Sequence, residues 1–255
     1  MGVHNSAATG FAVAAETYAL GRPDYPADAL LWLREALKLG PGKTALEVGA
    51  GTGKFIPVLR QSGASLYALE PVDAMRQRLA STYDDVKVLA GTAASIPLPD
   101  GSVDAVVCAQ AFHWFATPEV LREFRRVLAP GGMLGLIWNV RDEATPWVAG
   151  LSAITDPFEG DTPRYRSGAW RAVFPADGFA FVAERAAPYT HRGSAEDVIL
   201  RRTLSVSFVA AQTAAVQQKI VAAIASLISR TPDLAGHEEV AFPYETRMFT
   251  YKKTA

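Results

Sequence analysis

Residues 46–55 read LEVGAGTGKF and place one carboxylate, Glu47, directly before a glycine-rich turn. Gly49, Gly51 and Gly53 alternate with small residues, which leaves this stretch of backbone without bulky side chains. Glycine lets a ligand approach the backbone closely and adopts positive φ angles at little steric cost. The pattern therefore predicts a loop that binds a small ligand, with an acid beside it.

A second acid, Glu70, ends an apolar run and lies 21 positions after Gly49. A carboxylate can accept hydrogen bonds from both hydroxyls of a ribose. In doubly wound nucleotide sites, an acid at about this spacing binds the ribose. The loop and the second acid together predict a ligand that contains a nucleoside.

The spacing argues against two common nucleotide sites. A dinucleotide fingerprint counted from Gly49 requires a glycine where Lys54 stands. A P-loop requires serine or threonine after the Gly-Lys pair, and Phe55 follows it here.

The elements around these residues alternate between strand and helix patterns over roughly the first 140 residues. Strands are predicted at 44–49, 65–71, 86–93, 103–112 and 133–140, and helices at 26–39, 54–63, 72–83 and 118–132. Repeated units of this kind predict an α/β fold with a doubly wound, mostly parallel sheet. The first predicted strand runs into the glycine loop, which is where open α/β sheets bind ligands.

The regular alternation of strand and helix patterns ends after residue 140. Further strands are predicted at 179–189 and 240–253. The stretches 194–204 and 214–230 between them have amphipathic helical periodicity. We therefore expect a helical insert at about 194–230, between the last two strands.

Composition limits the classes of function. The chain has 255 residues, 25 basic against 26 acidic, and no long run of like charge, so neither a nucleic-acid nor a membrane partner is expected. The single cysteine and four scattered histidines show no metal-ligand spacing, so no metal is expected. The start of the chain lacks a signal-peptide pattern, and we expect a cytoplasmic protein.

The arrangement Glu47-x-Gly49-x-Gly51-x-Gly53 resembles motif I of the class I S-adenosylmethionine-dependent methyltransferases. The resemblance continues in order through 69–75, 91–115 and 121–139. More narrowly, YALGRPDYP at 18–26 together with QAFHWF is similar to a small-molecule branch that includes trans-aconitate methyltransferase-like enzymes. The resemblance implies a seven-stranded Rossmann-like sheet and S-adenosylmethionine as cofactor, with S-adenosylhomocysteine as product.

The resemblance also implies a division of the chain. Residues 1–43 would form a helical segment that closes over the cofactor, and 44–193 with 231–255 would form the core. Residues 194–230 would form a cap over the substrate pocket.

Individual roles follow from the same resemblance. The implied cofactor-binding residues are Tyr18, Arg22, Glu47, Gly49, Ala50, Gly51, Gly53, Glu70, Pro71, Met75, Thr92, Ala93, Ala94, Ala109 and Gln110. The implied substrate-binding residues are Trp114 and Asn139. Thr92 stands where many relatives have an aspartate for the adenine amine, so adenine would rely on backbone N–H groups near Ala93 and Ala94. Arg22 would pair with the cofactor carboxylate or with an anionic substrate.

The catalytic candidate is His113, in the apolar segment 111–115. Methyl transfer is an in-line displacement that needs a general base only when the accepting O, N or C atom must lose a proton. His113 would act as that base, would orient the acceptor, or would be a core residue satisfied by the backbone.

Three functions are consistent with these patterns. The first is methyl transfer to a small-molecule acceptor by a monomer or homodimer. The second is a cofactor-binding protein without turnover, and the third is a nicotinamide-dependent oxidoreductase.

Overall fold

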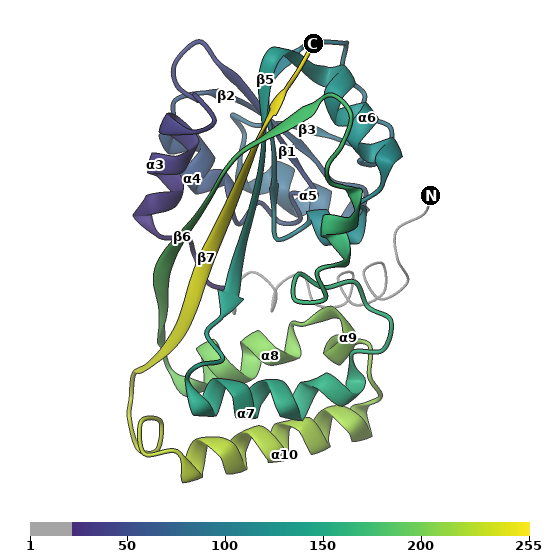
Figure 1. Ribbon diagram of the computed structural model, residues 1–255. Coiled ribbons are helices and arrows are strands. Elements are labelled where there is room, and N and C mark those ends of the chain that lie inside the picture. Colours follow the sequence, from purple (N-terminus) through teal and green to yellow (C-terminus); the bar gives the residue numbers. More distant parts are fainter. Residues whose placement is uncertain (1–21) are drawn as a thin grey trace.

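The computed structural model describes residues 22–255, and its centre is a seven-stranded sheet in the order β3-β2-β1-β4-β5-β7-β6 (Figure 1). The strands are β1 (Thr44–Val48), β2 (Ser65–Leu69), β3 (Lys87–Leu89), β4 (Val103–Ala109), β5 (Leu128–Arg141), β6 (Phe179–Gly193) and β7 (Val240–Lys253). Strands β1 to β5 pair in parallel, and β7 runs antiparallel to both β5 and β6. The predicted mostly parallel, seven-stranded sheet is thus confirmed.

Both faces of the sheet are covered by helices. The helices that flank it are α3 (Ala27–Glu35), α4 (Ile56–Gln61), α5 (Asp73–Thr82) and α6 (Pro118–Val127), with the short turn η3 (Ala169–Val173). Successive side chains of a strand point to opposite faces. In β4, Ala105 accordingly belongs to the buried cluster that contains Trp32 of α3, whereas Val106 belongs to the cluster that contains Phe124 of α6.

Helix α6 begins at a regular cap and ends earlier than the sequence predicted. The Thr117 side chain accepts a hydrogen bond from the backbone N–H of Val120 over 3.3 Å. The helix stops at Val127, before the Pro-Gly-Gly at 130–132 that the sequence predicted would end it. Leu128 is already extended and pairs with the sheet, and a residue before proline, here Ala129, disfavours helical geometry.

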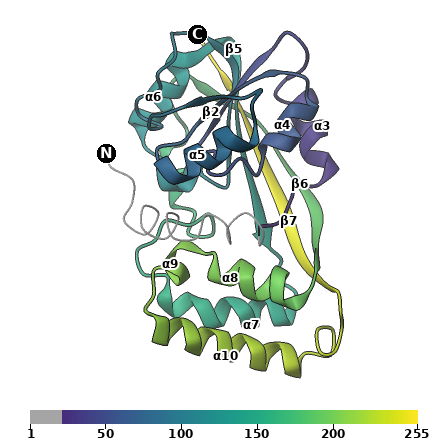
Figure 2. The same cartoon turned by 180° about the vertical axis from the view of Figure 1, so that it is seen from behind.

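A separate helical layer lies beyond one end of the sheet (Figures 1 and 2). It consists of α7 (Pro146–Thr155), η4 (Glu196–Arg201), α8 (Arg202–Leu204), α9 (Ser207–Ala210) and α10 (Ala214–Arg230). Its own buried cluster includes Leu151, Ile199, Ile220 and Ile224. Because α7 precedes β6, this layer draws on more of the chain than the predicted insert at 194–230.

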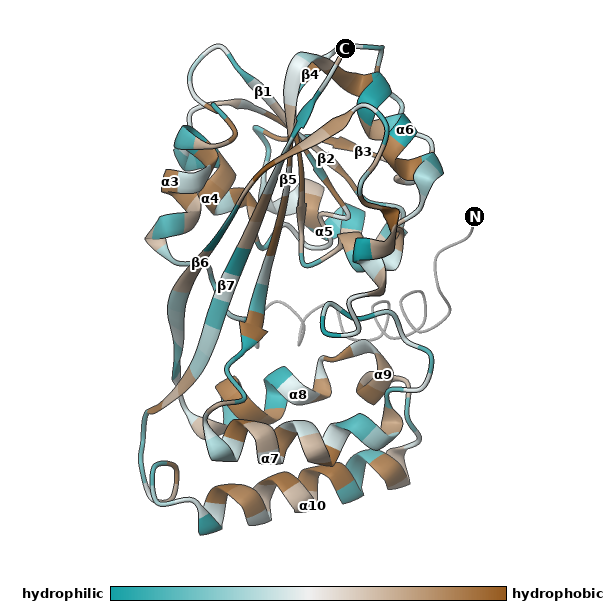
Figure 3. Ribbon diagram, viewed as in Figure 1, coloured by the Kyte–Doolittle hydropathy of each residue, from teal (hydrophilic) through white to brown (hydrophobic). Residues whose placement is uncertain are grey.

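The long strands β6 and β7 connect the sheet to the helical layer. Hydrophilic stretches run along them in Figure 3, and most β6 side chains are exposed. Within the part of the chain that the structure describes, no helix is long and apolar enough to cross a membrane. Of the predicted N-terminal segment 1–43, residues 1–21 lie outside the described residues.

Candidate functional site

The glycine loop, the second acid and the segment after β4 meet at one edge of the sheet. Gly49 follows β1, Glu70 follows β2 and Gln110 follows β4, and these three strands are neighbours. The order of strands along the sheet reverses between β1 and β4, which is the place where open α/β sheets bind ligands. A cavity of about 310 Å³, here called the loop cavity, lies at this edge.

Most of the residues that the resemblance implied line this loop cavity. They are Arg22, Glu47, Gly49, Ala50, Gly51, Glu70, Pro71, Met75, Thr92, Ala93, Ala94, Ala109, Gln110, His113 and Trp114. Gly53 and Asn139 are not among its lining residues. Tyr18 lies outside the described residues.

The three loop glycines have different local surroundings. All have positive φ, but a Cβ on Gly51 would approach nothing closer than Met75 Sδ at 3.9 Å. A Cβ on Gly53 would lie 2.6 Å from a ring carbon of Tyr83. Gly51 therefore leaves room for a ligand, whereas Gly53 packs closely against Tyr83. The role of Gly53 as a cofactor contact stays a prediction.

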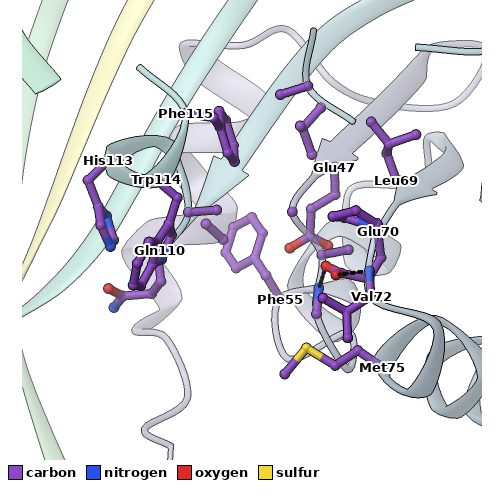
Figure 4. A pocket seen from close by; sticks show the side chains of 18 of the residues that line it. Glu47, Phe55, Leu69, Glu70, Val72, Met75, Gln110, His113, Trp114 and Phe115 are labelled. Carbon is purple, nitrogen blue, oxygen red and sulfur yellow. Dashed lines mark hydrogen bonds between the residues drawn. The ribbon is translucent and has the colours of Figure 1, made fainter. Parts of the chain in front are cut away.

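Glu70 is held by the backbone of the loop. Its carboxylate accepts hydrogen bonds from the N–H groups of Gly51 and Val72, each over 2.8 Å (Figure 4). An ionised carboxylate has about four acceptor sites, so capacity remains for two ligand hydroxyls. Burial raises the pKa of Glu70, and the two backbone N–H groups oppose that shift.

Glu47 lies beside Glu70 with an unsatisfied oxygen. Only 1% of its surface is exposed, and its Oε2 has no hydrogen-bond partner among the described residues. Burial raises the pKa of Glu47 well above its usual value, and the neighbouring charge of Glu70 raises it further. A cationic amine of a ligand would satisfy this oxygen, which fits the amino-acid end of S-adenosylmethionine (SAM).

His113 lies on the opposite side of the loop cavity from the two glutamates, in the short turn η1 (Phe112–Trp114) (Figure 4). The indole N–H of Trp138 donates to His113 Nδ1 over 3.1 Å. In neutral His113 the proton therefore resides on Nε2. Burial, together with the charges of Arg164 and Arg22, lowers the pKa of His113 to about 3. This arrangement favours a hydrogen-bond donor and disfavours the predicted general base.

Asn139 has both ends of its side chain engaged inside the protein. Its amide donates to the Asp24 carbonyl over 2.8 Å, and its carbonyl accepts from the Thr246 hydroxyl over 2.6 Å. These bonds connect the segment before α3 to strands β5 and β7. Gln110, beside it, has a φ of 57°, a backbone strain of the kind that clusters at functional sites.

A second cavity of about 230 Å³ adjoins the first, and Gln110, His113 and Trp114 line both. Asn139 lines this second cavity. Five arginines also line it: Arg22, Arg141, Arg164, Arg166 and Arg202. The sequence analysis missed the last four, because they come from separate segments and share no motif. We call this space the arginine cavity.

The comparisons with known proteins agree with this geometry. A family model described as a methyltransferase domain matches residues 46–136. The chain is 34% identical over 239 residues to an uncharacterized methyltransferase-like protein of Schizosaccharomyces pombe, with 92% of each chain covered. It is 35% identical over 236 residues to an uncharacterized methyltransferase of Mycobacterium tuberculosis, again with 92% of each chain covered.

Solved structures support the same fold. A proposed type II methyltransferase from Anaeromyxobacter dehalogenans superposes with a TM-score of 0.63 at 22% identity, covering 91% of this chain and 97% of that one. The cyclase SpnF superposes with a TM-score of 0.58 at 19% identity, covering 96% and 94%. Because a cyclase shares the fold, the fold alone does not define the reaction.

The fold and the loop cavity define a nucleoside-binding α/β enzyme. The relatives that match over 92% of each chain show the family to which it belongs. The chain belongs to the class I SAM-dependent methyltransferases. This assignment sets aside the nicotinamide oxidoreductase that the sequence left open.

Proposed function

We propose that this methyltransferase transfers the methyl group of SAM to a small molecule bound in the arginine cavity. The observation that carries the proposal is the shared wall of the two cavities. Gln110, His113 and Trp114 line both, so a ligand in one cavity faces a ligand in the other. The second cavity, at about 230 Å³, lies just below the usual size range of ligand pockets, which supports a small acceptor.

The cofactor would be held by the loop cavity. Glu70 would accept from the ribose hydroxyls, and Glu47 would face the amine. Pro71 and Met75 would lie against adenine, with Thr92 near its amine. When bound, SAM supplies a methyl group that its positive sulfur activates for displacement.

The protein's contribution to such a displacement is orientation and exclusion of water. Well-oriented reactants gain about 7–11 kcal/mol relative to a bimolecular reaction in water. His113, as an Nε2–H donor, would orient the acceptor. An acceptor atom that is already anionic loses no proton and needs no base.

The helical layer and the N-terminal segment would enclose the acceptor. Arg202 of α8 lines both cavities, which supports a capping role for the layer. The Arg22 guanidinium donates to the Ser205 carbonyl over 3.2 Å and so joins the segment before α3 to the layer. We propose that residues 1–43 close over the cofactor.

The cofactor half of the proposal is tested by Gly51→Val. Its side chain would enter the loop cavity, so SAM binding measured by calorimetry should be lost while the circular dichroism spectrum is kept. Gly160→Val is the matched control, because Gly160 has a φ of 57° against 59° for Gly51 and nothing within 4 Å of its Cβ position. Equal affinity in both variants would contradict the assigned cofactor site.

The acceptor half is tested by release of S-adenosylhomocysteine with a panel of small acids, phenols and amines, beside bulk RNA and protein. We expect turnover with a small molecule. Methylation of RNA or protein alone, or no turnover with any acceptor, would contradict the proposal.

A further inference from the structure

Residues 22–25 form a short segment beside both cavities, here called the strap. They precede α3 and belong to no helix or strand. Arg22, Pro23 and Tyr25 line the loop cavity, and Arg22 also lines the arginine cavity. A segment without regular secondary structure opens at low cost in free energy unless other contacts hold it. The contacts of the strap therefore decide how firmly it encloses a ligand.

Two of these contacts attach the strap to β5 and to the glycine loop. The side-chain amide of Asn139 donates a hydrogen bond to the Asp24 carbonyl over 2.8 Å. The Tyr25 ring meets the Phe55 ring edge-on, with the ring centroids 4.6 Å apart. Phe55 is 1% exposed, so it offers the strap a fixed partner.

Lys54 adds an ion pair from the end of the same loop. Its Nζ lies 2.6 Å from Oδ1 of Asp24, and Lys54 also lines the loop cavity. Two consecutive residues after the glycines, Lys54 and Phe55, thus hold two consecutive residues of the strap, Asp24 and Tyr25. The side chain that stands where a dinucleotide fingerprint requires glycine therefore connects the cofactor loop to the strap.

This ion pair adds little to the stability of the fold. The Asp24 side chain is 74% exposed and the Lys54 side chain 31%. Water screens a pair of this kind, and the ordering of two side chains opposes it, so its contribution to the free energy of unfolding is small. A small free energy is still sufficient to bias a short segment between two positions.

Asp24 connects the walls of the two cavities. Its carbonyl accepts from Asn139, which lines the arginine cavity, and its carboxylate pairs with Lys54, which lines the loop cavity. A displacement of Asp24 would therefore disturb Arg22 and Tyr25, its neighbours that line the loop cavity.

We propose that Lys54 is a positioning residue that holds the strap over bound SAM through its ion pair with Asp24. The inference rests on the proposed function, because it names the contact that fixes part of the segment proposed to close over the cofactor. A ligand enclosed by such a segment leaves when the segment opens. The ion pair therefore slows the dissociation of SAM.

The first experiment measures the rates of SAM binding to the immobilised full chain by surface plasmon resonance. Lys54→Met should raise the dissociation rate about three- to fivefold, because an exposed ion pair biases closure by no more than its own small free energy. The association rate should not fall. Lys43→Met is the matched control, because Lys43 pairs with Asp104 over 2.9 Å before β1, at the other end of that strand from the glycine loop. Equal dissociation rates in the two variants would overturn the inference.

A double-mutant cycle tests whether Lys54 acts through Asp24. Lys54→Met and Asp24→Ala should raise the dissociation rate by the same factor, and the double variant should raise it no further. If Lys54 instead contacted the cofactor directly, Asp24→Ala would leave the dissociation rate unchanged. That result would overturn the inference.

A conservative variant and added salt provide an independent check. Lys54→Arg keeps a cation for Asp24 and should dissociate SAM at nearly the native rate. Salt screens exposed charges, so a higher ionic strength should reduce the difference between the native protein and Lys54→Met. A Lys54→Arg variant as fast as Lys54→Met, or a difference that salt does not reduce, would overturn the inference.

Hydrogen exchange and thermal unfolding separate positioning from a structural role. SAM should slow amide exchange in the peptide that contains the strap, and it should do so less in Lys54→Met. Without SAM, Lys54→Met should melt no lower than Lys43→Met. A lower melting temperature with unchanged SAM dissociation would assign the ion pair to the stability of the fold and overturn the inference.

The outcomes also separate this inference from the proposed function. If SAM binds and the protein methylates a small molecule while the strap peptide gains no protection, the positioning role of Lys54 is wrong and the proposed function stands. Slower exchange in the strap peptide with SAM, together with methylation of RNA or protein alone, would do the reverse.

Discussion

The indole Nε1–H of Trp138 donates a hydrogen bond to Nδ1 of His113 across 3.1 Å. Trp138 is 1% exposed and packs against the rings of Trp170 and Phe249, so this donor cannot easily turn away. Protonation of Nδ1 would place two N–H groups against each other. The contact thus keeps His113 neutral, with its proton on Nε2, and His113 lines both cavities.

We therefore expect His113 to be the Nε2–H tautomer throughout the working pH range. Since its pKa is lowered to about 3, the neutral form persists as pH falls through the usual histidine range near 6.5. Nitrogen-15 correlation spectra of labelled protein would identify the tautomer, and kcat should show no acid limb near pH 6–7. An imidazolium signal at pH 6 would contradict this prediction.

Two substitutions distinguish a donor from a base. His113→Asn keeps a side-chain donor and should raise acceptor KM less than His113→Ala does. If His113 were a base, both variants would lower kcat by about 10²–10⁴ with cofactor affinity intact. Steady-state kinetics with the acceptor at saturation would separate these patterns.

Cofactor binding should release a proton from Glu47. The raised pKa means that Glu47 of the free protein holds a proton above its usual range, whereas a cationic amine requires the carboxylate. SAM affinity should therefore rise with pH toward that raised pKa. Calorimetry near pH 6 in buffers of different ionisation enthalpy would measure the release, because the α-amine is then already protonated.

Glu47→Gln is the control for this linkage. The variant cannot release a proton, so its binding heat should no longer depend on the buffer. The substitution should also remove the pH dependence that Glu47 gives to the free energy of unfolding. Because the folded-state pKa of Glu47 is raised, its contribution to stability is present at low pH and is lost as pH rises. A buffer-dependent heat in the variant would assign the proton to another group.

Replacing Glu70 should weaken SAM binding. Charge-assisted hydrogen bonds contribute roughly 1.5–3 kcal/mol each, so Glu70→Ala should raise the dissociation constant about tenfold or more. Asp73→Asn is a nearby control, because Asp73 is exposed and pairs with Arg76. Unchanged affinity in Glu70→Ala would move the ribose contact elsewhere.

The helical layer should govern the acceptor more than the cofactor. Ile224 of α10 is fully buried in the layer's cluster, and truncation of such a residue to alanine costs about 2–5 kcal/mol. Ile224→Ala should therefore lower the melting temperature and raise acceptor KM, with SAM affinity nearly unchanged. Lys219 is exposed on the same helix, so Lys219→Ala should change none of these quantities. A loss of SAM affinity in several layer variants would contradict the prediction that the layer affects the acceptor more than the cofactor.

The sequence determined the features that depend on local pattern. Apolar runs that alternate with helical patterns predicted the mostly parallel sheet, and the bounds of β7 were predicted to the residue. The glycine loop and Glu70 could be placed at one edge, because parallel strands end on the same side of a sheet. Helix α6 was predicted too long, since pairing of Leu128 with the sheet is not visible in helical periodicity.

The tertiary structure alone decided the surroundings of the second cavity. Arg141, Arg164 and Arg202 are distant in the sequence, and they converge only because the helical layer folds back over the sheet edge. The tautomer of His113 likewise depends on Trp138 of a neighbouring strand. Local periodicity reports which face of an element is buried, but contacts between distant segments depend on how whole elements pack. For that reason the sequence indicated the cofactor, whereas the charge of the cavity beside it became visible only in the fold.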